Sequence, residues 1–309
     1  MESEIPAKNN NVWTPTLSMT SSETRDSEAM EMESQTEIQN LLTAYSEATG
    51  LEQRELAKVI QKCITEKASH NGPTLERLAL NLFPCARTEK DVKLEDDDSG
   101  FEETRWHLLN HARSVGVDLK VEERELGQIV NGNAFMVFNC MVGLPHMGRS
   151  RGRGQVMEFM KIAKGLLAKS EGIITFGDGE DSNKVENYAS YPLFFDGKLS
   201  HYKALYESME WGFPSYLNEG RMAMETLFVV PFVSSVSWLQ KWEEGREYMF
   251  SQNALGLKGR KMSRESWNEA RELVKEGESP YKIRVEGGNE NEMVLEWNGT
   301  SLVRVSVWM

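Results

Sequence analysis

Arginine and lysine side chains gather in one stretch of an otherwise acidic chain. Glu158 is the only acid between residues 149 and 169. Glycines interrupt the arginine part and let a loop fold closely onto a phosphate backbone, whose oxygens guanidinium groups bind in pairs. This pattern predicts contact with a polyanion. The basic residues of the stretch are Arg149, Arg151, Arg153, Lys161, Lys164 and Lys169.

A second basic stretch lies in another glycine-interrupted loop, directly before a predicted helix. It contains Lys258, Arg260, Lys261 and Arg264. Guanidinium planes also stack on unpaired RNA bases, so two such loops lining one groove would hold single-stranded RNA. We predict that these ten side chains bind nucleic acid. The alternative is a solvated lysine face beside a glycine loop that binds nothing.

Other residue types with chemical potential give weaker patterns. His107 and His111 are four residues apart on a predicted helix, which permits a shared metal, but the glutamate of a zinc protease motif is absent between them. His146 follows Cys140 by six residues, and a nucleophile pair there needs convergence that spacing alone cannot show. Residues 177–181 resemble part of a calcium loop without its terminal glutamate. We therefore expect no enzyme activity, cofactor or metal.

The net charge of −13 over 309 residues belongs mainly to two segments. Residues 1–35 carry −5 and residues 91–103 carry −6, so the remaining chain is nearly neutral and its charge does not exclude a polyanion partner. Three cysteines without a CxxC motif are typical of a reduced, intracellular protein. The apolar run Leu227–Val233 is too short to cross a bilayer, and the acidic start is unlike a secretory signal. We expect a cytoplasmic protein that is neither secreted nor membrane-spanning.

Composition and periodicity divide the chain into five parts. Residues 1–35 are predicted to be a disordered acidic arm, and residues 36–88 a small helical module that packs on the body or binds a protein partner. An acidic linker at 89–103 leads to a mainly helical body at 104–279. Residues 280–309 alternate polar and apolar side chains in three runs separated by glycine turns. The prediction there is a three-stranded antiparallel meander.

Within the body the patterns differ in clarity. Residues 121–144 include an apolar run that predicts a central buried helix or a buried strand, and Gln155–Ser170 predicts an amphipathic helix. Residues 187–220 are rich in aromatic residues and helix breakers, so short helices mixed with loops are expected. Ser263 is placed to cap another helix. The fold class is therefore mainly α with a small C-terminal antiparallel β-meander (α+β).

Three functions are compatible with these features. The first is a non-enzymatic, self-assembling RNA-binding protein of the nucleocapsid type found in virions, whose acidic arms compete with RNA for the basic loops. The second is a protein-interaction or matrix-type scaffold whose basic loop contacts membrane phosphates. The third is an enzyme for a small anionic substrate, with His146 and Asp178 as acid and base.

Overall fold

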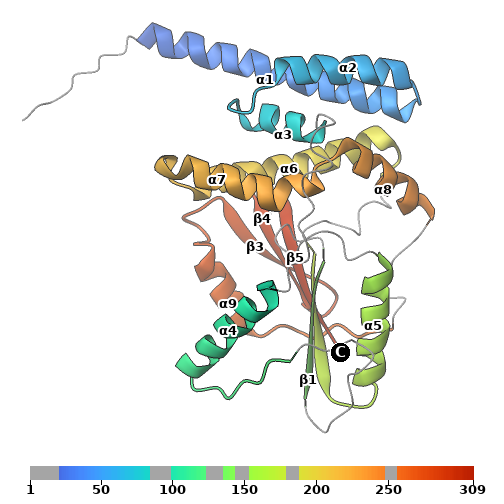
Figure 1. Cartoon of the computed structure of the whole chain (residues 1–309), viewed down its shortest axis with the longest axis vertical. Helices are drawn as coiled ribbons and strands as arrows, with labels where there is room; N and C mark the ends of the chain where they lie inside the picture. Colours follow the sequence, from blue (N-terminus) through green and yellow to red (C-terminus); the bar gives the residue numbers. More distant parts are fainter. Residues whose placement is uncertain (1–20, 84–98, 123–134, 143–152, 179–187, 248–255) are drawn as a thin grey trace, which may run out of the picture.

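Helices dominate the structure and stack in layers on one mixed β-sheet. The computed structural model describes residues 21–83, 99–122, 135–142, 153–178, 188–247 and 256–309. Figure 1 shows α1, α2 and α3 as an outer layer, with α6 and α7 beneath them and the sheet below. The helices of the described residues are α1 (Ser21–Gly50), α2 (Arg54–Lys67), α3 (Thr74–Leu82), α4 (Ser99–Ser114), α5 (Arg153–Leu167), α6 (Tyr191–Gly212), α7 (Asn218–Met224), α8 (Ser235–Glu247) and α9 (Arg264–Leu273).

Short helical turns surround α7. A 3₁₀ turn, η4 (Ser215–Leu217), precedes it. A π-helical turn, η5 (Glu225–Val229), and a 3₁₀ turn, η6 (Val230–Phe232), follow it and lead to α8. Pro231 lies in η6, as expected for a residue that lacks the N–H needed inside an α-helix. The chain around Pro231 is therefore helical but interrupted between α7 and α8.

The predicted C-terminal meander is confirmed, but it is part of a larger sheet. The strands are β1 (Met136–Val142), β2 (Gly172–Asp178), β3 (Tyr281–Glu286), β4 (Glu292–Trp297) and β5 (Thr300–Trp308), in the order β1-β2-β5-β4-β3. The antiparallel meander β3-β4-β5 continues through β2, which pairs with β5 from Ile174–Trp308 to Asp178–Arg304. Because β1 and β2 are parallel, the sheet is mixed rather than purely antiparallel.

Strand β1 settles the alternative between helix and strand for the apolar run. Phe138 and Cys140 are buried while Val137 and Asn139 are exposed, which is the period of two that a strand produces. The alternative of a central buried helix is therefore wrong, and the strand, at the edge of the described sheet, is buried on one face. Helix α5 follows β1 and connects it to the parallel β2, as parallel pairs require a crossover.

Helix α6 joins the outer helices to the sheet. Its aromatic side chains Phe194, Phe195 and Tyr202 belong to the core shared with α1, α2, α3 and α8. Ala204 packs on the other side against Trp297 and Leu302 of the sheet. A helix covered on two sides has no single apolar stripe. This explains why short helices mixed with loops were predicted where one helix of 22 residues forms.

The N-terminal arm and the acidic linker differ from their predictions. Helix α1 begins at Ser21, so residues 21–35 are helical instead of disordered, while residues 1–20 lie outside the described residues. Helix α4 begins at Ser99 and takes in the end of the predicted linker, whose residues 89–98 are not described. Helices α1, α2 and α3 occupy the predicted module at 36–88 and share one hydrophobic core with α6 and α8. The domain boundaries themselves stay a prediction.

A network of buried charges ties α3 to α6 and to the start of η5. Arg77 Nη2 donates to Glu210 Oε1 at 2.7 Å and to Glu225 Oε1 at 3.2 Å. Arg221 forms an ion pair with Glu225, and its Nε also donates to Asn218 Oδ1 at 3.1 Å. Arg77, Arg221 and Glu225 are each at most 9% exposed. Two cations and two carboxylates balance here, which buried charges require.

Two glycines of the β1-α5-β2 unit make a matched test of this packing. A Cβ at Gly172 would lie 2.2 Å from the Met136 carbonyl oxygen, whereas a Cβ at Gly165 in α5 meets nothing within 4 Å. We expect Gly172→Ala to lower the free energy of unfolding, because the β1–β2 pairing must shift. Gly165→Ala should raise it by up to about 1 kcal/mol, because alanine is the better helix former. Urea unfolding followed by circular dichroism measures both, and equal effects would contradict the register.

The buried charge network gives a second stability prediction. Glu225→Leu leaves the Arg77 and Arg221 guanidinium groups buried together without their shared carboxylate. Removing one partner of a buried ion pair costs about 3–5 kcal/mol of unfolding free energy. The control is Glu66→Leu, which breaks an exposed pair with Lys62 and should cost less than about 1 kcal/mol. Tryptophan fluorescence in urea distinguishes the two, and similar losses would show that the network is unimportant.

Candidate protein-interaction surface

The first basic stretch is only partly visible in the described structure. Arg149 and Arg151 lie outside the described residues, and Arg153 is the first residue of α5. Lys161, Lys164 and Lys169 are exposed along or just after that helix, and the predicted amphipathic helix is confirmed.

The second basic stretch is an extended segment beside the end of β5. The Lys258 N–H donates to the Met309 carbonyl and the Arg260 N–H donates to the Val307 carbonyl, at 2.9 and 3.0 Å. A Cβ at Gly256 would lie 3.4 Å from Lys164 Nζ, so the structure brings this stretch next to α5. A groove lined by both basic stretches stays a prediction.

Two of these basic side chains already have partners within the chain. The Arg260 guanidinium lies 5.9 Å from the centre of the Phe135 ring, and Lys261 forms an ion pair with Glu290. Lys258 and Arg264 are exposed, and Arg264 begins α9 after the Ser263 cap, whose Oγ accepts from the Ser266 N–H at 3.1 Å. A role of the ten basic residues in polyanion binding stays a prediction.

The other candidate residues are dispersed. His107 and His111 are both exposed on α4, and His107 Nε2 is 3.9 Å from a Glu103 carboxylate oxygen. Across the part of the chain that the structure describes, no three His, Cys, Asp or Glu side chains gather as metal ligands. His146 and residues 179–181 lie outside the described residues, and Asp178 ends β2. The pairing of His146 with Asp178 as an acid and a base therefore falls outside the part of the chain that the structure describes.

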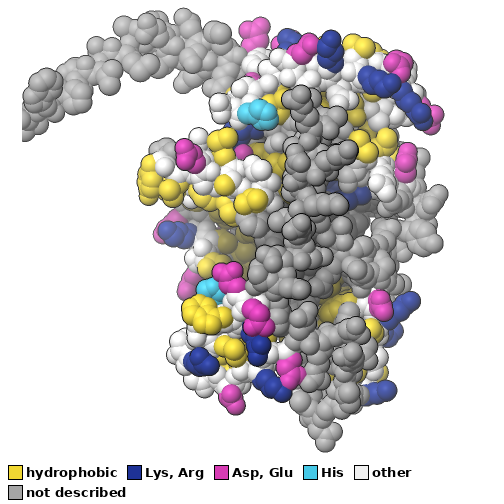
Figure 2. Space-filling model, in the orientation of Figure 1, with side chains coloured by type: hydrophobic (Ala, Val, Ile, Leu, Met, Phe, Trp, Pro, Cys, Tyr) yellow, Lys and Arg dark blue, Asp and Glu magenta, His cyan; other side chains and the backbone are white. Residues whose placement is uncertain are grey.

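An apolar surface over α7 is the feature that the sequence analysis missed. Tyr216 is 83% exposed and Leu227 is 57% exposed, and Leu217 and Met224 lie between them in sequence with 45% and 40% exposed. We call these four side chains the α7 surface. In Figure 2, yellow side chains gather over α7 at the left of the molecule. Large apolar side chains grouped in this way are uncommon on monomeric soluble proteins and mark interaction sites.

The polarity of α7 and η5 is inverted relative to an ordinary surface helix. Arg221 and Glu225, four residues apart, point inward and are buried in the charge network. Met224 and Leu227, three residues apart, point outward. A surface helix normally buries its apolar side and exposes its charges. Because the ion pairs fix the charged side inward, the apolar side is held at the surface.

The hydropathy of the sequence also marks the stretch around α7 as unusually apolar. Residues Asn218–Glu243 are long and apolar enough, by length and composition alone, to cross a membrane, with a mean hydropathy of 1.5 in their most apolar window. No membrane-spanning segment was expected, because the apolar run Leu227–Val233 is too short to cross a bilayer. Only 29% of that window is buried in the structure. The run Leu227–Val233 was the signal in the sequence that could have located the exposed apolar surface.

Comparisons with known proteins identify relatives of this chain. A family model described as the GRAS domain family matches residues 86–309. The Nodulation Signaling Pathway 2 proteins of Medicago truncatula and Lotus japonicus are 27% and 28% identical to it over 255 and 253 residues. These matches cover 78% and 77% of this chain but 47% of each relative, so the chain spans about half the length of these curated relatives.

Solved structures also match the chain. Among them is the crystal structure of SCL7 from Oryza sativa, with a TM-score of 0.49 and 19% identity. The match covers 68% of this chain and 60% of that chain.

These matches overturn the leading functional hypothesis. The prediction of a viral, nucleocapsid-like RNA-coating protein located in virions is wrong, because the matched family and relatives are plant signalling proteins. The basic glycine loops suggested RNA because their local charge was considered without the rest of the fold. The alternative of a protein-interaction scaffold agrees better with the relatives. Since the family model matches more than half of the chain, the chain belongs to the GRAS domain family.

Proposed function

We propose that this chain is a non-enzymatic, protein-binding component of a plant signalling pathway that regulates transcription. Membership of the GRAS domain family and the names of the Nodulation Signaling Pathway 2 relatives support a role in signalling. Because the chain spans about half the length of those relatives, their pathway comes to it only as part of this proposal. The site of action is intracellular, in the nucleus.

The α7 surface is the observation that carries the proposal. Its occupant is a partner protein that offers apolar anchor residues flanked by lysine or arginine. Glu219 is the only exposed charged side chain between residues 213 and 234, since Arg221 and Glu225 are buried. An apolar patch with an acidic edge complements an apolar segment with basic flanks.

Other contacts remain compatible with this role. Helix α2 and the turn before it expose Leu51, Leu56 and Val59, and a protein partner for residues 1–88 stays a prediction, as does self-association. The α7 surface is distinct from that module, so the two contacts would be separable by substitution.

The partner chemistry is tested by selecting, from a random library of displayed 16-residue peptides, those that bind the purified full chain. The selected peptides should be enriched in apolar residues flanked by lysine or arginine. The Met224→Asp/Leu227→Asp variant should lose at least about tenfold in affinity for them, because a central apolar anchor contributes about 2 kcal/mol or more. Isothermal titration calorimetry measures the loss.

Leu273→Asp is the matched control for this experiment. Leu273 is 86% exposed on α9, so its substitution places the same charge on the surface away from α7. The affinity of this variant for the selected peptides should be unchanged. In plant cells, a transcription reporter should respond to the Leu273→Asp variant as it does to the unaltered chain, and it should not respond to the Met224→Asp/Leu227→Asp variant. Two other outcomes would contradict a partner-protein segment as the occupant. One is dimerisation of the chain at high concentration, and the other is sedimentation with phospholipid vesicles, where the Met224→Asp/Leu227→Asp variant abolishes the effect.

A further inference from the structure

The two edges of the described β-sheet differ in their side chains. Strand β3, at one edge, carries Lys282, Arg284 and Glu286 among its six residues. Strand β1, at the other edge, has seven residues and contains no charged residue and no proline. Charged side chains and prolines are common means by which proteins prevent an edge strand from pairing with another chain. Of the two edges, β1 is therefore the one that lacks this protection.

The composition of β1 is that of a strand inside a sheet. Every residue of β1 except Asn139 is apolar, and parallel strands have such nearly continuous apolar runs when both of their faces are covered. In this structure one face is covered, since Phe138 and Cys140 pack with Met160 of α5. Val137 on the opposite face is 60% exposed. The strand therefore has more apolar surface than the described part of the chain covers.

The outer edge of β1 also presents backbone hydrogen-bonding groups. The Met136 N–H donates to the Glu171 carbonyl, directly before β2, at 2.9 Å. Because the backbone groups of successive residues point to opposite sides of a strand, Val137, Asn139 and Met141 direct theirs away from β2. No strand of the described sheet lies on that side. An incoming strand would meet the N–H and C=O groups of these three residues.

This edge is complementary to itself. When two β1 strands pair antiparallel about a two-fold axis at Asn139, this residue faces its own copy and Val137 faces Met141. These are the residues whose backbone groups point outward, so each facing pair exchanges two hydrogen bonds. On the covered face Phe138 comes opposite Cys140, which brings the two apolar clusters under α5 together. Since β1 contains no charged residue, no like charges oppose this arrangement within the strand.

We propose that two copies of this chain associate through β1, with the two β1 strands antiparallel across a two-fold axis at Asn139. The two five-stranded sheets then form one continuous sheet, whose outer edges are the charged β3 strands. A closed two-fold pair leaves no β1 edge open to further copies. This interface does not depend on the α7 surface, because α7 lies in the helical layer (Figure 1).

Sedimentation velocity with paired variants at Asn139 tests the proposal. Asn139 is exposed, so its substitution changes the surface of the sheet and not the core. Asn139→Lys places two like charges opposite each other across the two-fold axis, and so does Asn139→Glu. Each variant alone should raise the dimer dissociation constant at least about tenfold. An equal mixture of the two should dimerise as well as the unaltered chain, because the two new charges then attract each other.

The mixture keeps the result interpretable even where one substitution disturbs β1. A residue meets its own copy only on the two-fold axis, so recovery in the mixture requires the proposed register. A full chain that sediments as a monomer at every concentration would overturn the proposal. Homodimers of both variants as stable as that of the unaltered chain would contradict it as well, and so would a mixture that stays monomeric.

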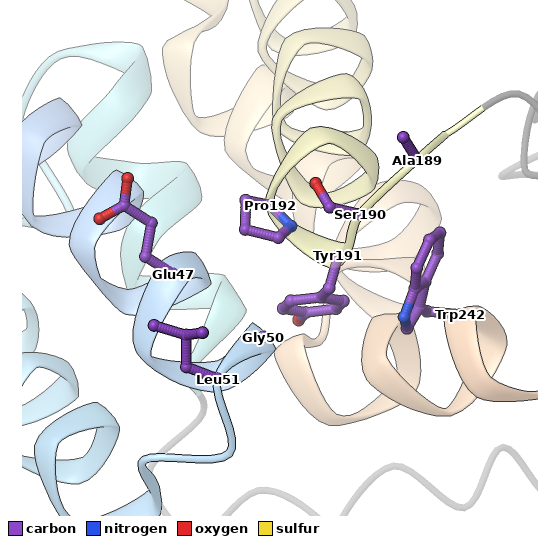
Figure 3. Close-up of a pocket in the computed structure, with 8 residues that line it drawn as sticks. All are labelled: Glu47, Gly50, Leu51, Ala189, Ser190, Tyr191, Pro192 and Trp242. Carbon is purple, nitrogen blue, oxygen red and sulfur yellow. The ribbon is translucent and has the colours of Figure 1, made fainter.

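Two control variants separate β1 from other surfaces. Asn268→Lys makes the same substitution at an exposed position of α9. Leu51→Lys places a lysine on the helical layer, where Figure 3 shows Leu51 next to Gly50 at the end of α1 and where its side chain is 68% exposed. Both should change the dissociation constant by less than about twofold. Loss of the dimer with Leu51→Lys but not with Asn139→Lys would place the contact on the helical layer and is incompatible with the proposal.

Hydrogen–deuterium exchange locates the contact directly. The amides of Val137, Asn139 and Met141 should exchange quickly in the monomer, since no strand of the described sheet offers them an acceptor, and slowly in the dimer. The peptide that contains β1 should therefore gain protection as the concentration of the chain rises, and Asn139→Lys should remove this gain. Protection of β1 that does not change on dimerisation would show that the interface lies elsewhere.

Discussion

The arrangement of the outer helices depends on the buried ion pairs that Arg77 and Arg221 make with Glu225. Charges removed from water are tolerated only when they are balanced and hydrogen-bonded, so this cluster fixes the rotation of α7 and η5 about their axis. Arg77 Nη2 donates to Glu210, and Thr74 Oγ1 donates to the same carboxylate at 2.8 Å, which ties α3 to α6. The exposed apolar side of α7 is thus a consequence of what its other side must bury.

Helix α6 connects this buried charge network to the rest of the molecule. Its Tyr206 hydroxyl accepts from Asn81 of α3 at 2.8 Å, while His201 Nδ1 lies 2.9 Å from the Ser301 carbonyl of β5. Burial raises the pKa of Tyr206, so the phenol stays neutral inside the helical core. With the outer helices on one side and Trp297 of the sheet on the other, α6 connects the helical layer to the sheet.

The parts of the fold that followed from the sequence are those with a clear local pattern. Polar and apolar residues alternate along the sequences of β3 to β5, although a register shift at Leu295 and Glu296 interrupts the pairing of β4 with β5. The chain turns at Asn298 and Gly299, whose positive φ values of 46° and 84° suit a tight hairpin. Helix α5 shows its lysines to solvent, and Ser263 caps α9 as its spacing predicted. In contrast, α6 is covered on two sides, and the β1 run is apolar at every position except Asn139, so periodicity could not determine either.

The candidate sites were harder to predict because they depend on long-range contacts. The basic loops were predicted as a binding site from the charges of neighbouring residues in the sequence. In the folded chain, however, Lys261 is paired with Glu290 and Arg260 lies against Phe135. Nothing in the local sequence indicated that Arg221 and Glu225 are buried, where they turn Met224 and Leu227 outward. Glu47 and Asp196 are unremarkable in the sequence and line two adjoining cavities only because α1 packs on α6.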